Sequence, residues 1–344
     1  MSPFPSLRVT LSYILFFIAS VVAGPPTISL SYGTFQGLSD GNLTKFLGVP
    51  FAQSCVLFSL SSLGLTELNI SSSGRFEVLK APGLLHGLQN ATAFGPACPQ
   101  QALTPLPIPF ASAPYPSISE NCHTLDIFKP SSPGSGYRLP VFIWLYDGAF
   151  EVGNSRDTDV SLVVERSVQT GEPIIIVIPN YRLSAFGFLA GREVHAAGVT
   201  NLGFPPMKIP SEIFALEWVQ KYISAFGGDP NRVVIGGQSA GARSTALLLL
   251  SNNRNSNALF CKVFMESGST IGSPSPAVLQ SHYDALVAAN NCSADTETLS
   301  CLRRVPFDSF MATVNRTAGI FRTKALRLCG SHTSTATLLR ATRN

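Results

Sequence analysis

The feature that most constrains this chain is a serine placed where a buried strand turns into a helix. The apolar run 233–235 predicts the strand, and 240–250 predicts the helix. Between them lies Gly237-x-Ser239-x-Gly241. Strand and helix nearly collide at such a turn, so the serine needs small neighbours and projects from the top of a sheet. The pattern predicts Ser239 as a nucleophile, and the alternative interpretation is an ordinary tight turn.

Further apolar runs predict the rest of a doubly wound α/β sheet. Residues 140–145 and 173–178 are continuously apolar, as are 233–235 and 263–265, which is typical of central parallel strands covered on both faces. Segments long enough to form crossover helices connect them. The clearest helix has apolar residues at helical spacing, with Trp218 beside the stripe as a predicted core residue: Ile213, Leu216, Val219, Ile223 and Phe226. Short strands are expected at 27–30 and 33–37.

The N-terminus predicts secretion. Arg8 precedes the apolar run 11–22, and small residues follow, which predicts a signal peptide over 1–23. The run is shorter than the ~20 residues of a membrane span, although an N-terminal anchor is the alternative. Five N-glycosylation sequons fit an extracellular location: Asn42, Asn69, Asn90, Asn291 and Asn315.

Charge and cysteine usage exclude several functions. The net charge of +4 is scattered, without a basic stripe that would favour nucleic acid as a partner. We find no Cys-x-x-Cys pair or histidine cluster that predicts a metal site, and we expect no cofactor. Seven cysteines in a secreted chain indicate disulfides with at least one thiol left over.

Several stretches resemble the type-B carboxylesterase/lipase family, the α/β-hydrolases that include fungal secreted lipases and cholinesterases. The resemblance covers about residues 27–310 and rests on Phe-Gly-Gly-Asp-Pro at 226–230, Phe-Met-Glu-Ser-Gly-Ser at 264–269, and the segments 46–53, 91–100 and 180–189. It implies an α/β-hydrolase fold with a mostly parallel central sheet and helices on both faces. It also implies hydrolysis of a small-molecule or lipid carboxylic ester through a serine acyl-enzyme. We interpret 180–189 as structural scaffolding.

The resemblance implies an oxyanion hole at 146–150, directly after the predicted strand 140–145. By position in the family motif, the N–H groups of Gly148, Ala149 and Ala240 would be the donors. Asp147 departs from the usual glycine, and Gln238 stands where the family most often carries glutamate. An ordinary strand-to-loop turn is the alternative interpretation of 146–150.

The resemblance also implies two disulfides, Cys98–Cys122 and Cys292–Cys301. Three cysteines are left unexplained: Cys55, Cys261 and Cys329. Cys261 lies in an apolar run, and we expect it to be a buried thiol.

The catalytic acid and base are not assigned. The fold places them after the serine, and only His282 and His332 follow Ser239. We expect His282 on the surface of a helix, and His332 lacks the family's histidine-loop context. Two acids, Glu266 and Asp284, precede the place where the family acid would fall. We expect Glu120 to be a structural ion-pair partner rather than a catalytic acid.

The family pattern is interrupted at 54–73 and at 204–214, and it disappears after about residue 315. From these departures we expect one α/β-hydrolase domain over 24–344, incomplete at its C-terminus, from a truncated or mis-assembled gene product. Such a sheet would leave an unpaired edge. The alternatives to an active hydrolase are therefore a catalytically inactive fragment and a non-catalytic binding member of the same fold.

Overall fold

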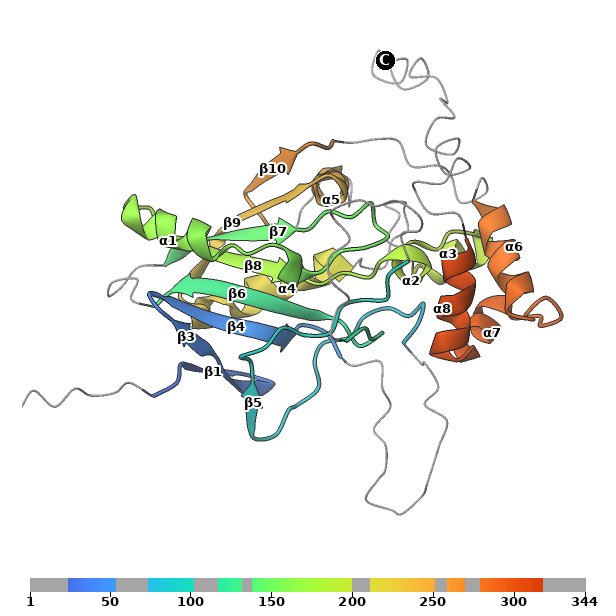
Figure 1. Cartoon of the computed structure of the whole chain (residues 1–344), viewed down its shortest axis with the longest axis horizontal. Helices are drawn as coiled ribbons and strands as arrows, with labels where there is room; N and C mark the ends of the chain where they lie inside the picture. Colours follow the sequence, from blue (N-terminus) through green and yellow to red (C-terminus); the bar gives the residue numbers. More distant parts are fainter. Residues whose placement is uncertain are drawn as a thin grey trace, which may run out of the picture.

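The computed structural model describes residues 24–53, 74–101, 117–131, 138–199, 211–250, 259–269 and 279–317 (Figure 1). The predicted signal peptide and the tail after 317 lie outside these residues, as does the insertion 54–73. The same holds for four single residues named above: Cys55, Asn69, Cys329 and His332.

A seven-stranded sheet forms the centre of the molecule, in the order β10-β9-β7-β8-β6-β4-β3 (Figure 1). Its strands are β3 (Leu38–Asp40), β4 (Leu43–Pro50), β6 (Thr124–Pro130), β7 (Leu139–Leu145), β8 (Ile175–Pro179), β9 (Gly228–Gln238) and β10 (Lys262–Glu266). The four strands predicted from apolar runs are all present, and they pair in parallel as β10-β9-β7-β8. The predicted α/β-hydrolase fold class is confirmed. Antiparallel pairing of β6, β4 and β3 makes the sheet mixed.

A second, three-stranded sheet combines the first two strands of the described chain with a later one. It consists of β1 (Thr27–Leu30), β2 (Gly33–Gln36) and β5 (Leu88–Asn90), in the order β1-β2-β5. The two short strands expected at 27–30 and 33–37 are β1 and β2, paired as an antiparallel hairpin.

The two faces of the central sheet belong to different cores, because side chains alternate along a strand. From β7, Val141, Ile143 and Leu145 pack with Leu216 of α4 (Ser211–Tyr222) and Leu248 of α5 (Ala240–Leu250). Phe142 and Trp144 of the same strand pack on the other core, which includes Val164 of α1 (Ser161–Gln169). Helices therefore cover both faces, as predicted.

The predicted helical stripe is confirmed as core packing. It spans α4 and the 3-10 turn η3 (Ile223–Phe226), and Leu216, Val219, Ile223 and Phe226 are buried. Trp218 is also buried, and its Nε1 donates a hydrogen bond to the Tyr32 hydroxyl at 3.0 Å. Trp218 is thus a core residue that links α4 to the N-terminal strands.

Five helices gather at one end of the sheet (Figure 1). They are α2 (Ser184–Phe188), α3 (Arg192–Ala197), α6 (Gln280–Ala289), α7 (Thr298–Arg304) and α8 (Phe307–Arg316). The 3-10 turn η2 (Ser155–Asp157) is not one of them. Their apolar side chains form a separate core around Phe186, Tyr283, Leu302 and Phe310. His282 is exposed on α6, as expected.

The structure contains both disulfides that the family resemblance implies, Cys98–Cys122 and Cys292–Cys301. The expectation of a buried thiol at Cys261 is wrong, because Cys261 is a free, exposed cysteine. Cys261 immediately precedes β10, the outermost strand, so the apolar run around it lies at the sheet edge rather than in the core.

Burial shifts the pKa of several core side chains, among them two carboxyl groups and one imidazole. Burial raises the pKa of Asp126 to about 7, although hydrogen bonds from Ser155 and the Gly48 N–H oppose the shift. Burial also raises the pKa of Glu212 to about 7, and it lowers the pKa of His123 to about 3, with Arg182 contributing. The sequence did not single out Asp126 or Glu212, because burial of a polar residue is decided by tertiary packing.

Asp126→Asn is expected to reduce the loss of stability with rising pH. The folded state retains a proton on Asp126 that the unfolded state releases above its ordinary pKa of 3.8, so stability falls as pH rises through about 7. Between pH 4 and pH 8, urea unfolding should show the native chain losing roughly 2–4 kcal/mol more than the variant. The amide oxygen of the introduced asparagine can still accept the Gly48 N–H, which lies 2.7 Å from Asp126 Oδ1. Parallel pH profiles for the two proteins would contradict the assignment.

Candidate active site

Ser239 occupies the sharp turn between β9 and α5. Its backbone φ is +50°, in the left-handed region that non-glycine residues rarely adopt, and its side chain is exposed. The Ser239 N–H donates to the carbonyl of Glu266 at 2.9 Å, and the Ser239 carbonyl accepts the Arg243 N–H at 3.0 Å. Such a conformation costs about 1–3 kcal/mol and persists only when neighbours hold it. Strained and exposed at the end of a central strand, Ser239 has the geometry expected of a nucleophile elbow.

Gly237 and Gly241 allow this turn to form. A Cβ atom on Gly237 would lie 2.5 Å from the carbonyl oxygen of Leu145 and 2.6 Å from the carbonyl carbon of Gly241. A Cβ atom on Gly241 would overlap the Leu145 carbonyl oxygen and lie 2.8 Å from that of Tyr146. The clashing atoms belong to the backbone in both cases, so a side chain at either position would force the backbone itself to shift. The small residues in the motif are required by the approach of α5 to β7.

The loop 146–150 follows β7 and begins beside Ser239. Leu145 at the end of β7 pairs with Gly237 of β9, two residues before the serine. The loop bends through three successive positive φ values: +105° at Gly148, +59° at Ala149 and +64° at Phe150. The Gly148 carbonyl accepts the N–H groups of residues 151 and 152, each at 3.0 Å, which closes the turn. The loop is therefore a constrained backbone feature at the same end of the sheet as Ser239.

Three backbone N–H groups near Ser239 have no backbone acceptor among the described residues. Among the described residues, no backbone hydrogen bond uses the N–H of Gly148, Ala149 or Ala240 as donor. Ala240 begins α5, where the first N–H groups of a helix lack helical partners and favour negative charge. Asp147 is exposed.

The segment 180–189 supports the loop, as expected of scaffolding. The rings of Tyr181 and Tyr146 stack with centroids 4.2 Å apart. The Tyr181 hydroxyl donates to the Tyr146 carbonyl at 2.7 Å, and the Tyr146 hydroxyl donates to the Tyr181 carbonyl at 3.1 Å. Asn180 is fully buried and accepts the Ser155 N–H at 3.0 Å. Phe150 and Phe188 pack at 4.6 Å.

No histidine in the described ranges is hydrogen-bonded to Ser239. His123 is buried at the start of β6, and three strand-to-strand steps separate β6 from β9. Both ring nitrogens of His123 lack a hydrogen-bond partner within the described chain. With a pKa of about 3, this imidazole is a weak proton acceptor at neutral pH. The described residues therefore bring together the elbow and the loop, without a histidine hydrogen-bonded to Ser239.

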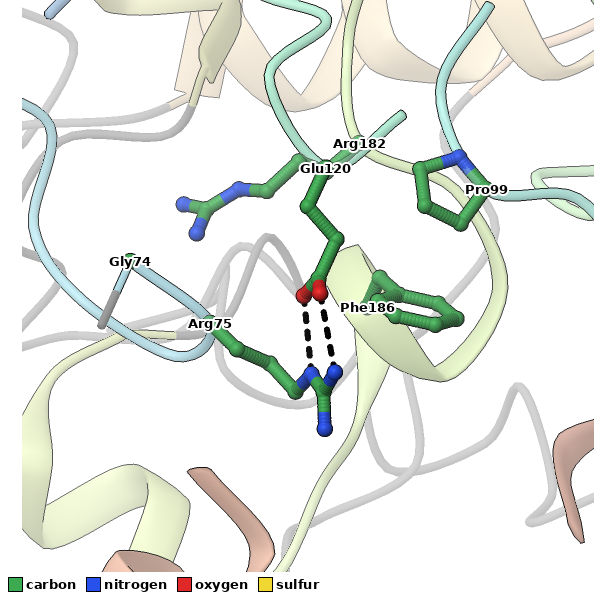
Figure 2. A pocket seen from close by; sticks show the side chains of 6 residues that line it. All are labelled: Gly74, Arg75, Pro99, Glu120, Arg182 and Phe186. Carbon is green, nitrogen blue, oxygen red and sulfur yellow. Dashed lines mark hydrogen bonds and ion pairs between the residues drawn. The ribbon is translucent and has the colours of Figure 1, made fainter. Parts of the chain in front are cut away.

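Figure 2 shows a small cavity framed by an ion pair, and none of its lining residues belongs to the elbow. Its volume is about 10 Å³, which is room for a single water molecule rather than an ester. Arg75 and Glu120 meet there in a bidentate pair, with Nε–Oε1 and Nη2–Oε2 distances of 2.8 Å each. The remaining lining residues are Gly74, Pro99, Arg182 and Phe186. The expected role of Glu120 as a structural ion-pair partner is confirmed.

The comparisons with known proteins agree with this fold. The sequence profile described as "Carboxylesterase family" matches residues 24–331. "Lipase 5" of Diutina rugosa is 33% identical over 340 residues, covering 92% of this chain and 58% of the relative. "Secreted triacylglycerol lipase LIP1" of Gibberella zeae is 31% identical, covering 89% of this chain and 52% of the relative.

A solved structure, that of EstA from Aspergillus niger, superposes with a TM-score of 0.69 at 27% identity, covering 85% of this chain and 50% of EstA. The chain thus spans somewhat more than half the length of the curated relatives it matches. With a family profile over all of its described residues, and with this fold around a strained serine, the chain belongs to the carboxylesterase family.

Proposed function

We propose that this chain carries the nucleophile of a secreted carboxylic ester hydrolase, with Ser239 forming the acyl-enzyme. The observation that supports it best is the positive φ of an exposed serine between β9 and α5, adjacent to the constrained loop 146–150. A backbone strained at one exposed serine is a typical feature of a functional site.

In the proposed reaction the Ser239 Oγ attacks the ester carbonyl carbon while its proton passes to a base. The carbonyl oxygen gains the negative charge, and the N–H groups of Gly148, Ala149 and Ala240 stabilise it. Each such donor is typically worth ~3 kcal/mol of the barrier. Collapse of the intermediate releases the alcohol, and water then attacks the acyl-enzyme and releases the acid. This chemistry requires no cofactor.

The proposed substrate class is a small-molecule or lipid carboxylic ester. The relatives named above, a lipase and a secreted triacylglycerol lipase, support lipid esters. Secretion is proposed on the second of these relatives and on the predicted signal peptide over 1–23, followed by a single domain over 24–344. No helix among the described residues has the length and apolarity to cross a bilayer.

The proposed glycosylation sites are compatible with the described surface. Asn42, Asn90 and Asn291 are exposed, and Asn315 is half-buried. Asn90 accepts hydrogen bonds from both the N–H and the hydroxyl of Thr92, the third residue of its sequon. Asn291 lies next to the Cys292–Cys301 disulfide.

A second candidate is a catalytically inactive fragment or a binding member of the same fold. The observation that favours it is that no described histidine is hydrogen-bonded to Ser239. Without a base to accept its proton, a serine hydroxyl is a poor nucleophile at neutral pH.

A fluorophosphonate probe separates the two candidates. The secreted chain is expected to gain one phosphonyl group in intact-mass spectrometry, and Ser239→Ala is expected to abolish the labelling. Ser224→Ala, at an exposed serine in η3, is the matched control and should label like the native chain. An unlabelled native chain would favour the inactive candidate, and labelling that survives Ser239→Ala would refute Ser239 as the nucleophile.

A further inference from the structure

The sequon Asn291-Cys292-Ser293 is built into the end of helix α6. Asn291 has a φ of +58°, in the left-handed region. Its N–H donates to the Ala288 carbonyl at 3.1 Å, and the N–H of Cys292 donates to the Val287 carbonyl at 2.9 Å. Two such hydrogen bonds around a left-handed residue form the Schellman motif that ends many helices. The first two residues of the sequon are therefore also the hydrogen-bonded end of α6.

A disulfide holds the middle residue of this sequon in the core. Cys292 is fully buried, and it belongs to the apolar core that contains Leu286 and Leu302. It is bonded to Cys301 of α7, nine residues further along the chain. To present the sequon as an open loop, the helix end must unwind and Cys292 must leave the core. The closed disulfide prevents both movements, because it ties Cys292 covalently to α7.

Glycan transfer requires the sequon in that open form. The Nδ2 atom of the asparagine forms a bond to the anomeric carbon of a lipid-linked oligosaccharide. The bond from this carbon to the pyrophosphate oxygen breaks, the lipid pyrophosphate leaves, and one Nδ2 proton passes to a base of the transferase. The transferase recognises the asparagine together with the hydroxyl residue two places later, so it must enclose all three residues. A buried and covalently tied Cys292 excludes this binding.

The sequon at Asn291 can close much sooner than the sequon at Asn42. Cys301 follows its disulfide partner by nine residues, which is about 0.5–2 s of synthesis at ~5–20 residues per second. Disulfide formation takes seconds or longer. In the other sequon, the hydroxyl of Thr44 shares a hydrogen bond at 3.0 Å with that of Ser131, which follows 87 residues later. The Asn42 sequon therefore stays open while its partner strand is still being synthesised.

We propose that glycan transfer to Asn291 competes with closure of the Cys292–Cys301 disulfide. Asn291 receives its glycan only in chains whose disulfide is still open, and chains that close first stay unmodified there. The oxidising strength of the compartment thus sets the fraction of chains that carry this glycan. The inference rests on the proposed secretion and does not depend on ester hydrolysis.

Glycan occupancy in the full chain, produced in a yeast secretion host with its own N-terminus, tests the proposal. Enzymatic release converts each glycosylated asparagine to aspartate, so peptide mass spectrometry measures occupancy at Asn291 and Asn42 in the same sample. The native chain is expected to be partly occupied at Asn291. Cys301→Ser leaves the sequon unchanged and removes the competing reaction. It is expected to lower the unoccupied fraction at Asn291 by about threefold or more, with Asn42 unchanged. Dithiothreitol during synthesis should reproduce this effect in the native chain and add nothing in Cys301→Ser.

The matched control is Cys122→Ser, which removes the second cysteine of the other disulfide and should leave occupancy at Asn291 unchanged. Intracellular and secreted pools are both measured, so a variant that is retained in the cell still gives a result. Three outcomes would overturn the competition: complete occupancy of Asn291 in the native chain, equal occupancy in Cys301→Ser, or an equal rise in Cys122→Ser. Chains without a glycan at both Asn42 and Asn291 would refute the proposed secretion, and this inference with it.

Discussion

Replacing Arg75 with methionine is expected to lower the free energy of unfolding by about 3–5 kcal/mol, as is typical when one partner of a buried ion pair is removed. The Arg75 side chain is fully buried, and its guanidinium binds the Glu120 carboxylate through two hydrogen bonds (Figure 2). Its third nitrogen, Nη1, donates to the carbonyls of Leu302 at 3.0 Å and Val305 at 2.9 Å. The guanidinium also lies 4.5 Å from the Phe310 ring centroid. Methionine would fill part of the space but would remove two hydrogen bonds from the Glu120 carboxylate and one from each of the two carbonyls.

Urea unfolding of Arg75→Met measures the loss. Arg304→Met is the matched control, because Arg304 pairs with Asp295 at 2.7 Å while remaining 62% exposed. An exposed pair of this kind is worth ~0–1 kcal/mol, so the control should unfold almost like the native chain. Adding Glu120→Gln to Arg75→Met removes the carboxylate charge that has lost its bidentate partner and should recover part of the stability. Equal losses in Arg75→Met and Arg304→Met would contradict the structural role of Arg75.

Gly241→Ala is expected to destabilise the fold by about 3 kcal/mol, at the upper end of the usual effect of overpacking. Alanine is otherwise the better helix former, so propensity alone predicts a gain of roughly 1 kcal/mol in α5. The added methyl group overlaps the Leu145 carbonyl oxygen, which belongs to the central strand β7. Either β7 or the start of α5 must shift, and both carry parts of the candidate site. The clash therefore outweighs the helix propensity.

Thermal and urea unfolding of Gly241→Ala test whether the substitution lowers or raises the stability of the fold. Gly83→Ala is the control, because a Cβ atom there would meet no heavy atom within 4 Å. The control should change stability by about 0.5 kcal/mol or less. Fluorophosphonate labelling of Ser239 should also fall in Gly241→Ala if the turn moves. A variant as stable as the native chain would mean that α5 does not approach β7 this closely.

The elements predicted most accurately are those whose signal is local. The helix after Ser239 was expected at 240–250 and spans those residues, because a small-residue turn precedes an apolar helical segment. The central strands were predicted from continuous apolar runs, since a strand buried on both faces needs apolar residues at every position. The antiparallel strands β4 and β6 mix polar and apolar residues, so their place in the sheet was not predicted.

In the candidate site, too, residues in short local motifs were predicted, whereas contacts between distant segments were not. Ser239, Gly148, Ala149 and Ala240 stand in short motifs at strand ends, and their roles remain proposals. The partner of Glu120 could not be derived from spacing, because Arg75 is 45 residues away. The exposure of Cys261 was predicted wrongly, because an apolar run has the same sequence pattern in a central strand as in an edge strand.

By itself, the sequence determined the fold class, the strand–turn–helix around Ser239 and the position of the loop 146–150, because these depend on contacts between near neighbours. Only the tertiary structure decided that Arg75 joins Glu120 to the carbonyls of Leu302 and Val305, some 230 residues along the chain. It likewise decided that Asp126 and Glu212 are buried and that β10 lies at the edge. The physical reason is that burial and ion pairing depend on which distant segments meet, and a linear pattern of residue types does not record those meetings.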